Sequence, residues 1–238
     1  MKFDANLLQA IGAWQKGWRE HQALREELAK NLCDAVRPLS PEFKTANGQA
    51  CYRKRFLHKG ELERIIMADW RDEGVVSWTL NRTFAEIFRG KSKDGAVTGA
   101  IFRRVPSDEE VIVNIPALWK NTDFVQSAES YRNRGGQHAE ALFYFRGAHD
   151  QAEIVLTAPL RASEIIALTG SSSPFDDLCD MLSLPHQGRD ELFKELVAQG
   201  IAMNELRYVD EIQTQKIIER TQDRMIKLVQ QICANKKQ

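Results

Sequence analysis

The chain has 238 residues, of which 43% are hydrophobic and 28% charged, a composition typical of a globular protein with a substantial core. Lysine and arginine together number 33, as do aspartate and glutamate, so the formal net charge is zero. This neutrality argues against a general polyanion-binding protein, whose surface would normally be basic.

The spacing of the cysteines indicates whether a metal site or disulfides are expected, and the first residues indicate whether a secretion signal is present. The four cysteines are far apart and none forms a Cys-x-x-Cys pair, which argues against a zinc site or a disulfide framework. The first residues contain no apolar signal core, and no stretch is long and apolar enough for a membrane span. We therefore expect a cytoplasmic protein with reduced thiols, no bound metal and no membrane partner.

The first zone, residues 4–37, has apolar side chains mainly at steps of three or four, which predicts an amphipathic helix. Asp4 is expected to cap its start, and Pro38 is expected to end it. Because Gly12 and Gly17 weaken the middle, two shorter helices are the alternative.

The second zone, residues 48–168, mixes strand and helix patterns. Strands are predicted at 50–57, 75–79, 96–104, 110–115, 141–146 and 153–158. Helices are predicted at 61–72 and 82–88. The polar segment 120–138, which contains Arg134-Gly135-Gly136, is predicted to be a long loop, and such loops often have a function.

The third zone is predicted to be helical again. A short helix is expected to open at Ser173-Pro174, a second covers 188–198, and an amphipathic pattern covers 203–233. The pattern as a whole predicts an α+β fold with a β-rich middle between helices. It divides the chain into an N-terminal helical segment, a core and a C-terminal helical segment packed on the core: 1–45, 46–170 and 171–238.

Three short segments of the second zone carry side chains suited to chemistry. They are Tyr52-Arg53, Ser77-Trp78-Thr79 and Gln151-Ala152-Glu153. Arginine in one strand, then a Ser-x-Thr strand, then Gln-x-Glu, in this order, resembles the R-S-E class of mono-ADP-ribosyltransferases, which includes clostridial toxins and many phage and bacterial effectors. The helix after the Ser-x-Thr strand, with Phe84 and Ala85, also resembles the family. The resemblance covers about residues 50–160.

The resemblance implies NAD as a substrate, a mixed, mostly antiparallel sheet pair that forms the NAD cleft, and transfer of ADP-ribose to a macromolecule. Glu153 would stabilise the oxocarbenium-like charge on the ribose. Ser77 would hydrogen-bond to Glu153 and fix its rotamer, and Arg53 would bind the diphosphate through two N–H groups. The remaining residues of the implied NAD site are Tyr52, Thr79 and Phe84.

Gln151 bears on the acceptor. If the segment is a strand, residues 151 and 153 face the same cleft. In the family a glutamate at the earlier position is associated with arginine acceptors, whereas a neutral amide suits an amide, a hydroxyl or a nucleobase. We therefore expect the acceptor to be a nucleic acid or a protein side chain other than arginine. For a toxin or effector of this kind, an inhibitor or antitoxin protein is a further candidate partner.

Several alternatives stay open at the level of sequence. Arg55 shares the strand face of Arg53 and is the alternative diphosphate ligand. Glu110 heads a second stretch in which acidic residues precede β-branched ones, and it is the alternative catalytic glutamate. The alternative functions are NAD hydrolysis, with water as the acceptor, and a non-catalytic module that binds nucleic acid or protein.

Overall fold

The computed structural model describes the chain in segments: residues 3–17, 22–89, 95–147, 151–169, 179, 181–185, 188–199 and 208–235. The fold is mixed α+β, as predicted, and the chain divides into two compact units. The first unit contains Met1–Arg53, Asp72–Ala85 and Arg104–Pro159. The second contains Lys54–Arg71, Glu86–Arg103 and Leu160–Gln238. Each unit is therefore assembled from stretches that are distant in sequence.

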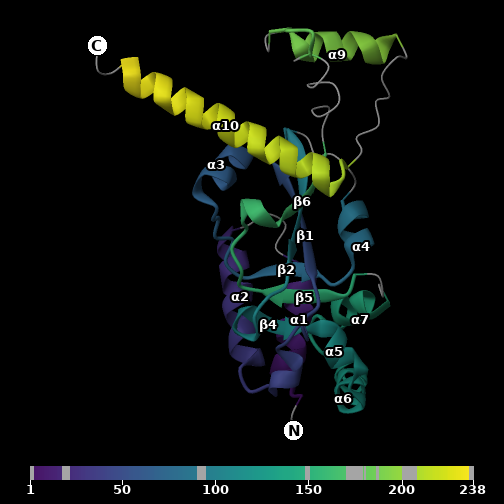
Figure 1. Ribbon diagram of the computed structural model, residues 1–238. Helices are drawn as coiled ribbons and strands as arrows, with labels where there is room; N and C mark the ends of the chain where they lie inside the picture. The colour runs from purple at the N-terminus through teal and green to yellow at the C-terminus, as the bar shows by residue number, and fades with distance from the viewer. Residues whose placement is uncertain are drawn as a thin grey trace. The chain divides into compact units, whose positions relative to one another are not determined.

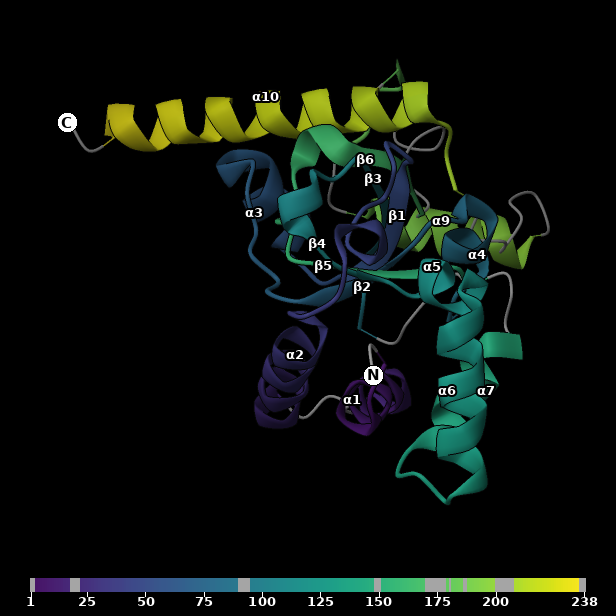
Figure 2. The same ribbon diagram turned by 90° about the horizontal axis from the view of Figure 1, so that it is seen from below.

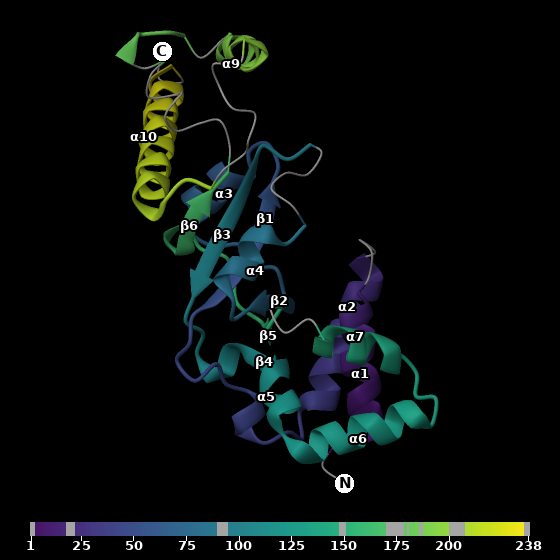
Figure 3. The ribbon, with the colours of Figure 1, turned by 90° about the vertical axis from the view of Figure 1, so that its right-hand side faces the viewer.

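The helices of the first unit gather around α1, which contacts α2, α6 and α7 (Figure 3). Their bounds are α1 (Ala5–Lys16), α2 (Gln22–Val36), α5 (Ile115–Lys120), α6 (Thr122–Asn133) and α7 (Ala139–Gly147), with 3-10 turns at Pro41–Phe43 and Asp108–Glu110. Asp4 caps α1 by accepting a hydrogen bond from the Leu7 amide. Gly17, with φ of 83°, ends α1, so the alternative of two shorter helices is confirmed.

The strands of the first unit pair antiparallel: β2 (Val76–Thr79) pairs with β5 (Glu153–Leu156), which also pairs with β4 (Val111–Asn114). Ser77 is opposite Val155, and Thr79 is opposite Glu153. Because side chains alternate between the two faces of a strand, these four residues share one face. Val155 belongs to a core cluster with Ile11 and other side chains of the helices. The helical layer therefore covers the face that carries Glu153.

The second unit contains the strands β3 (Thr98–Arg104) and β6 (Ile165–Leu168), which pair antiparallel. Its helices are α3 (Glu61–Ala68), α9 (Arg189–Ala198) and α10 (Glu211–Asn235), with a 3-10 turn at Ala162–Glu164. The first half of α10 packs on β6 and α3, and the second half continues past them (Figures 1 and 2). Accordingly, the buried residues of α10 all lie in its first half: Thr214, Ile218 and Thr221.

The strand β1 (Cys51–Leu57) begins in the first unit, where Tyr52 pairs with Thr79, and ends in the second. The short helix α4 (Arg82–Ile87) likewise crosses the boundary. Hydrogen bonding follows the order β4-β5-β2-β1-β3-β6. In the described part of the chain the strands thus form one antiparallel sheet, whereas a pair of sheets was expected.

Two predicted elements of the first unit are wrong. The segment 120–138 is mostly helix, because α6 buries Phe124, Ala128 and Tyr131 at steps of four and three, a helical stripe among polar residues. The loop prediction holds only for 134–138, the turn that contains Arg134-Gly135-Gly136. The segment 141–146 is not a strand but belongs to α7. Its short apolar run does not distinguish a strand from a helix, and the buried Ala139 and Leu142 three residues apart show the helical period.

Other predictions are partly met or untested. The helix predicted at 61–72 is shorter and ends at Ala68, because Asp69 has left-handed backbone geometry with φ of 47°. The helix expected at Ser173-Pro174 lies outside the described residues. Within the described residues, no helix combines the length and the apolar run that crossing a bilayer requires.

Candidate functional site

Ser77 and Glu153 form the centre of the candidate site. The Ser77 hydroxyl donates a hydrogen bond to Oε1 of Glu153 over 2.5 Å. The contact follows from the register of β2 and β5, which places Ser77 opposite Val155 and therefore diagonal to Glu153 on the same face. The hydrogen bond expected from the sequence between these two residues is present.

Glu153 is buried, with only 6% of its surface exposed, and α1 supplies two further donors to it. Nε1 of Trp14 lies 3.2 Å from Oε1 of Glu153 and 3.2 Å from the Ser77 hydroxyl. Nε2 of Gln15 lies 3.2 Å from Oε2. These donors are all uncharged. Burial raises the pKa of Glu153 above its ordinary value, and the hydrogen bonds from Ser77, Gln15 and Trp14 oppose that rise.

Gln15 is only partly satisfied in this arrangement. Its side chain is 8% exposed, and one end of its amide donates to Glu153. The other end, Oε1, is buried and has no hydrogen-bond partner among the described residues. An acceptor buried in this way destabilises the conformation that holds it. Sequence reasoning missed both Trp14 and Gln15; the one available signal was a polar Gln15 next to the apolar positions of α1.

Arg53 joins the site through the backbone of Ser77. Its Nη1 donates to the Ser77 carbonyl over 2.7 Å, and its Nε donates to the Glu73 carboxylate over 2.9 Å. Because Tyr52 pairs with Thr79, Tyr52 starts on the face of Glu153 and Arg53 on the opposite face. Arg53, Ser77 and Glu153 are thus connected by hydrogen bonds, but the guanidinium is held from the other side of the sheet.

Thr79 and Phe84 lie at the two sides of the turn that follows β2. The Thr79 hydroxyl donates to the Gln151 carbonyl over 2.5 Å and accepts from the Asn81 amide over 3.0 Å. Asn81 also accepts from the Phe84 amide over 3.2 Å, which caps α4. Phe84 is half-buried. These bonds fix the backbone at the end of β2, next to the start of β5.

The structure corrects the expected geometry of Gln151. It lies in a turn before β5, which begins at Glu153. Ala152 has φ of 38°, and its carbonyl accepts from the Leu80 amide over 3.0 Å. Since a left-handed residue interrupts the alternation of side chains, Gln151 and Glu153 do not share a strand face, contrary to the prediction.

The two alternative site residues are placed differently. Arg55 belongs to the second unit. Glu110 completes a capping box in which the Ser107 amide donates to it over 3.0 Å, and Nε of Arg104 donates to it over 3.1 Å. Burial alone would raise the pKa of Glu110, but the bonds from Arg104 and Ser107 outweigh burial and lower it. These contacts give Glu110 a structural role at the start of β4.

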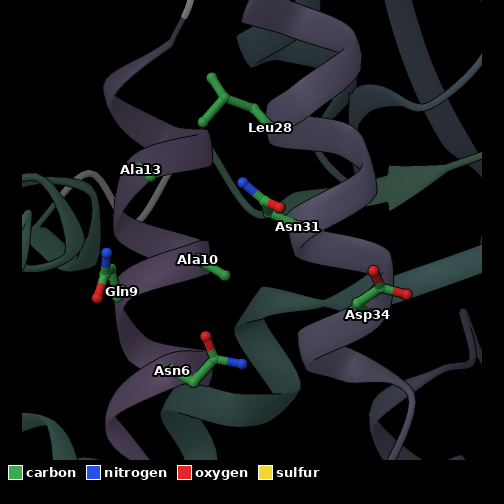
Figure 4. Close-up of a pocket in the computed structure, with 7 residues that line it drawn as sticks. All are labelled: Asn6, Gln9, Ala10, Ala13, Leu28, Asn31 and Asp34. Atoms are coloured by element: carbon green, nitrogen blue, oxygen red, sulfur yellow. The ribbon is translucent and has the colours of Figure 1, made fainter.

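Two pockets of the first unit lie elsewhere. One of about 260 Å³ lies between α1 and α2, where the amide of Asn31 extends from α2 toward α1 (Figure 4). The other, of about 340 Å³, is lined by residues that include Asn47, Leu80, Asn114 and Lys120. Neither pocket is lined by Glu153. The Glu153 carboxylate, which accepts hydrogen bonds from Trp14 and Gln15 of α1, is therefore part of neither pocket.

Comparison with models of protein families, with curated proteins and with solved structures gave no match to this chain.

Proposed function

We propose that the protein is a mono-ADP-ribosyltransferase that cleaves NAD and transfers ADP-ribose to a macromolecule. One observation carries the proposal. The three residues singled out by their order in the sequence are joined in space, because Arg53 donates to the Ser77 carbonyl and the Ser77 hydroxyl donates to Glu153. The second of these contacts is the one that the resemblance to the R-S-E class predicts.

The chemistry needs a carboxylate that is held still. When the bond between nicotinamide and C1′ of the ribose breaks, nicotinamide leaves with the electron pair and the ribose becomes oxocarbenium-like. The acceptor then forms a bond to C1′ and loses its proton. Glu153 stabilises the positive charge, and its buried surroundings strengthen that attraction. Ser77 fixes the orientation of the carboxylate.

Arg53 acts in this proposal as a positioning residue. Its guanidinium holds the strand carbonyl of Ser77 and pairs with Glu73, whose side chain is 5% exposed. The resemblance implies instead a direct contact between Arg53 and the NAD diphosphate. The bonds in the structure support the indirect role.

The acceptor we propose is a nucleic acid or a protein side chain other than arginine. The support is the neutral amide of Gln151, in the turn directly before Glu153, which can both donate and accept hydrogen bonds. In a toxin or effector of this class, an inhibitor protein would be the natural partner.

The test is release of nicotinamide from NAD by the purified full-length chain. We expect slow release by the wild type, loss of release in Glu153→Gln, and retention in the matched variant Glu110→Gln. Free ADP-ribose as the sole product identifies a hydrolase. Labelled NAD added to a cell lysate, followed by nuclease or protease digestion, identifies the acceptor. Loss of release in Glu110→Gln alone would show that Glu153 is not the catalytic carboxylate.

A further inference from the structure

Both carboxylate oxygens of Glu153 are engaged by consecutive residues of one helix. Trp14 donates to Oε1 and Gln15 donates to Oε2, each over 3.2 Å. We infer that the last turn of α1 is a cover that closes Glu153 in the resting protein, and that it must leave the carboxylate before a ligand can reach it. The inference rests on the proposed function, because it assigns the ligand as NAD.

In the closed state Glu153 is buried and its carboxylate already accepts hydrogen bonds from three donors. A ribose hydroxyl must come within about 3 Å of a carboxylate oxygen to share a hydrogen bond with it. Those positions are held by the indole of Trp14, the amide of Gln15 and the hydroxyl of Ser77. Trp14 is 2% exposed, so the contact between its indole and Glu153 is itself buried.

The last turn of α1 carries both donors to Glu153. The first part of the helix packs in the core through Leu7, Leu8 and Ile11, and Trp14 belongs to the same core cluster, so opening also has to expose the indole. The last turn ends at Gly17, whose positive φ of 83° glycine adopts without strain. The last turn of α1 can therefore change its backbone conformation at Gly17 while the first part of the helix stays in place.

The closed state also contains a local defect that favours opening. Oε1 of Gln15 is buried without a hydrogen-bond partner among the described residues. When the last turn moves away, this oxygen and the Glu153 carboxylate both regain hydrogen bonds with water or ligand. A ligand that binds only the open state shifts the population toward it.

Hydrogen exchange of the Trp14 indole N–H tests the opening directly, because that proton lies in the contact. Its signal is assigned by its loss in Trp14→Phe. In the wild type we expect exchange that is insensitive to low urea, the behaviour of a local opening, and that becomes faster when NAD is added. Exchange that follows global unfolding, with the full urea dependence, would overturn the inference.

Nicotinamide release by Gln15→Ala provides the second test. The control Gln9→Ala lies on the same helix, and its side chain contacts Gln137 instead of Glu153. We expect roughly tenfold faster release from NAD in Gln15→Ala, the effect of removing one hydrogen bond to a charged group from the closed state, and no change in Gln9→Ala. Slower nicotinamide release in Gln15→Ala would show that Gln15 assists catalysis, and would contradict the inference that it holds Glu153 closed. If the Trp14 indole N–H exchanges by a local opening but no variant releases nicotinamide, the proposed function is refuted. The inference that α1 covers Glu153 would still hold in that case.

Discussion

The hydroxyl of Ser77 lies 2.5 Å from the carboxylate of Glu153, although 76 positions separate the two residues in the chain. The contact depends on the register of β2 and β5, since a slip of one residue would turn one of the two side chains to the opposite face of the sheet. Arg53, on the neighbouring strand β1, donates to the Ser77 carbonyl. The candidate site is therefore a property of strand pairing, and each of its parts can be tested separately.

Replacing Ser77 with alanine removes the shortest hydrogen bond to Glu153. We expect nicotinamide release to fall about tenfold or more and the free energy of unfolding to fall by about 1–3 kcal/mol, because a buried carboxylate oxygen loses a donor. Ser77→Thr keeps the hydroxyl and is expected to retain most of both. Release assays and urea unfolding measure the two effects. Equal loss in Ser77→Thr and Ser77→Ala would show that the hydroxyl has no part in either.

Replacing Glu153 with glutamine should stabilise the protein near neutral pH. Burial raises the pKa of Glu153 above its ordinary value of 4.5, so the folded protein binds this proton more tightly than the unfolded chain does. The stability from this group is complete below pH 4.5 and is lost as the pH rises through the raised pKa. The new amide has no such titration, and it can donate to Oε1 of Gln15 after that amide rotates.

The measurement is the melting temperature of Glu153→Gln and wild type across a pH series that starts below 4.5, the ordinary pKa of the carboxyl group, and ends at neutral pH. We expect the advantage of the variant to grow as the pH rises. A difference that does not change with pH would contradict a raised pKa at Glu153.

The contact between Ser77 and Glu153 was expected from the resemblance to the R-S-E class, and the two strands that carry these residues were predicted from their short β-branched runs. The sequence pattern was insufficient to predict the helices α6 and α7. In α6 the buried stripe is narrow and the polar residues dominate, and in α7 the apolar run is too short to reveal its period.

The cover over Glu153 was beyond sequence reasoning for a different reason. Gln15 and Glu153 are 138 positions apart, and their contact depends on how α1 packs on the sheet. Helix packing is set by the fit of side chains from several elements, which no local pattern records. The geometry of Gln151 was predicted wrongly for another reason: the left-handed Ala152 that precedes β5 is neither glycine nor asparagine, so the sequence shows no sign of the turn.

Replacing Glu110 with glutamine should destabilise the protein without affecting nicotinamide release. Burial alone would raise the pKa of Glu110, but its bonds to Arg104 and Ser107 lower it below 4.5. A group with a lowered folded pKa contributes stability above its unfolded pKa, and this contribution is lost as the pH falls through the folded pKa. We expect a loss of about 1 kcal/mol at neutral pH that shrinks on acidification, measured by urea unfolding. A deficit that grows at lower pH would contradict this assignment.

Replacing Gly12 with alanine should reverse the usual effect of this substitution. In a helix interior, alanine is more favourable than glycine by about 1 kcal/mol. A Cβ at Gly12 would lie 2.6 Å from the carbonyl oxygen of His138 and 3.1 Å from its Cβ, so the neighbouring chain next to α7 must shift. We expect a net loss of about 1–3 kcal/mol in the free energy of unfolding, together with faster exchange at Trp14 as α1 loosens. Ala13→Gly, one position on, measures the helix propensity alone, and a Gly12→Ala variant more stable than wild type would show that α1 does not need this close approach.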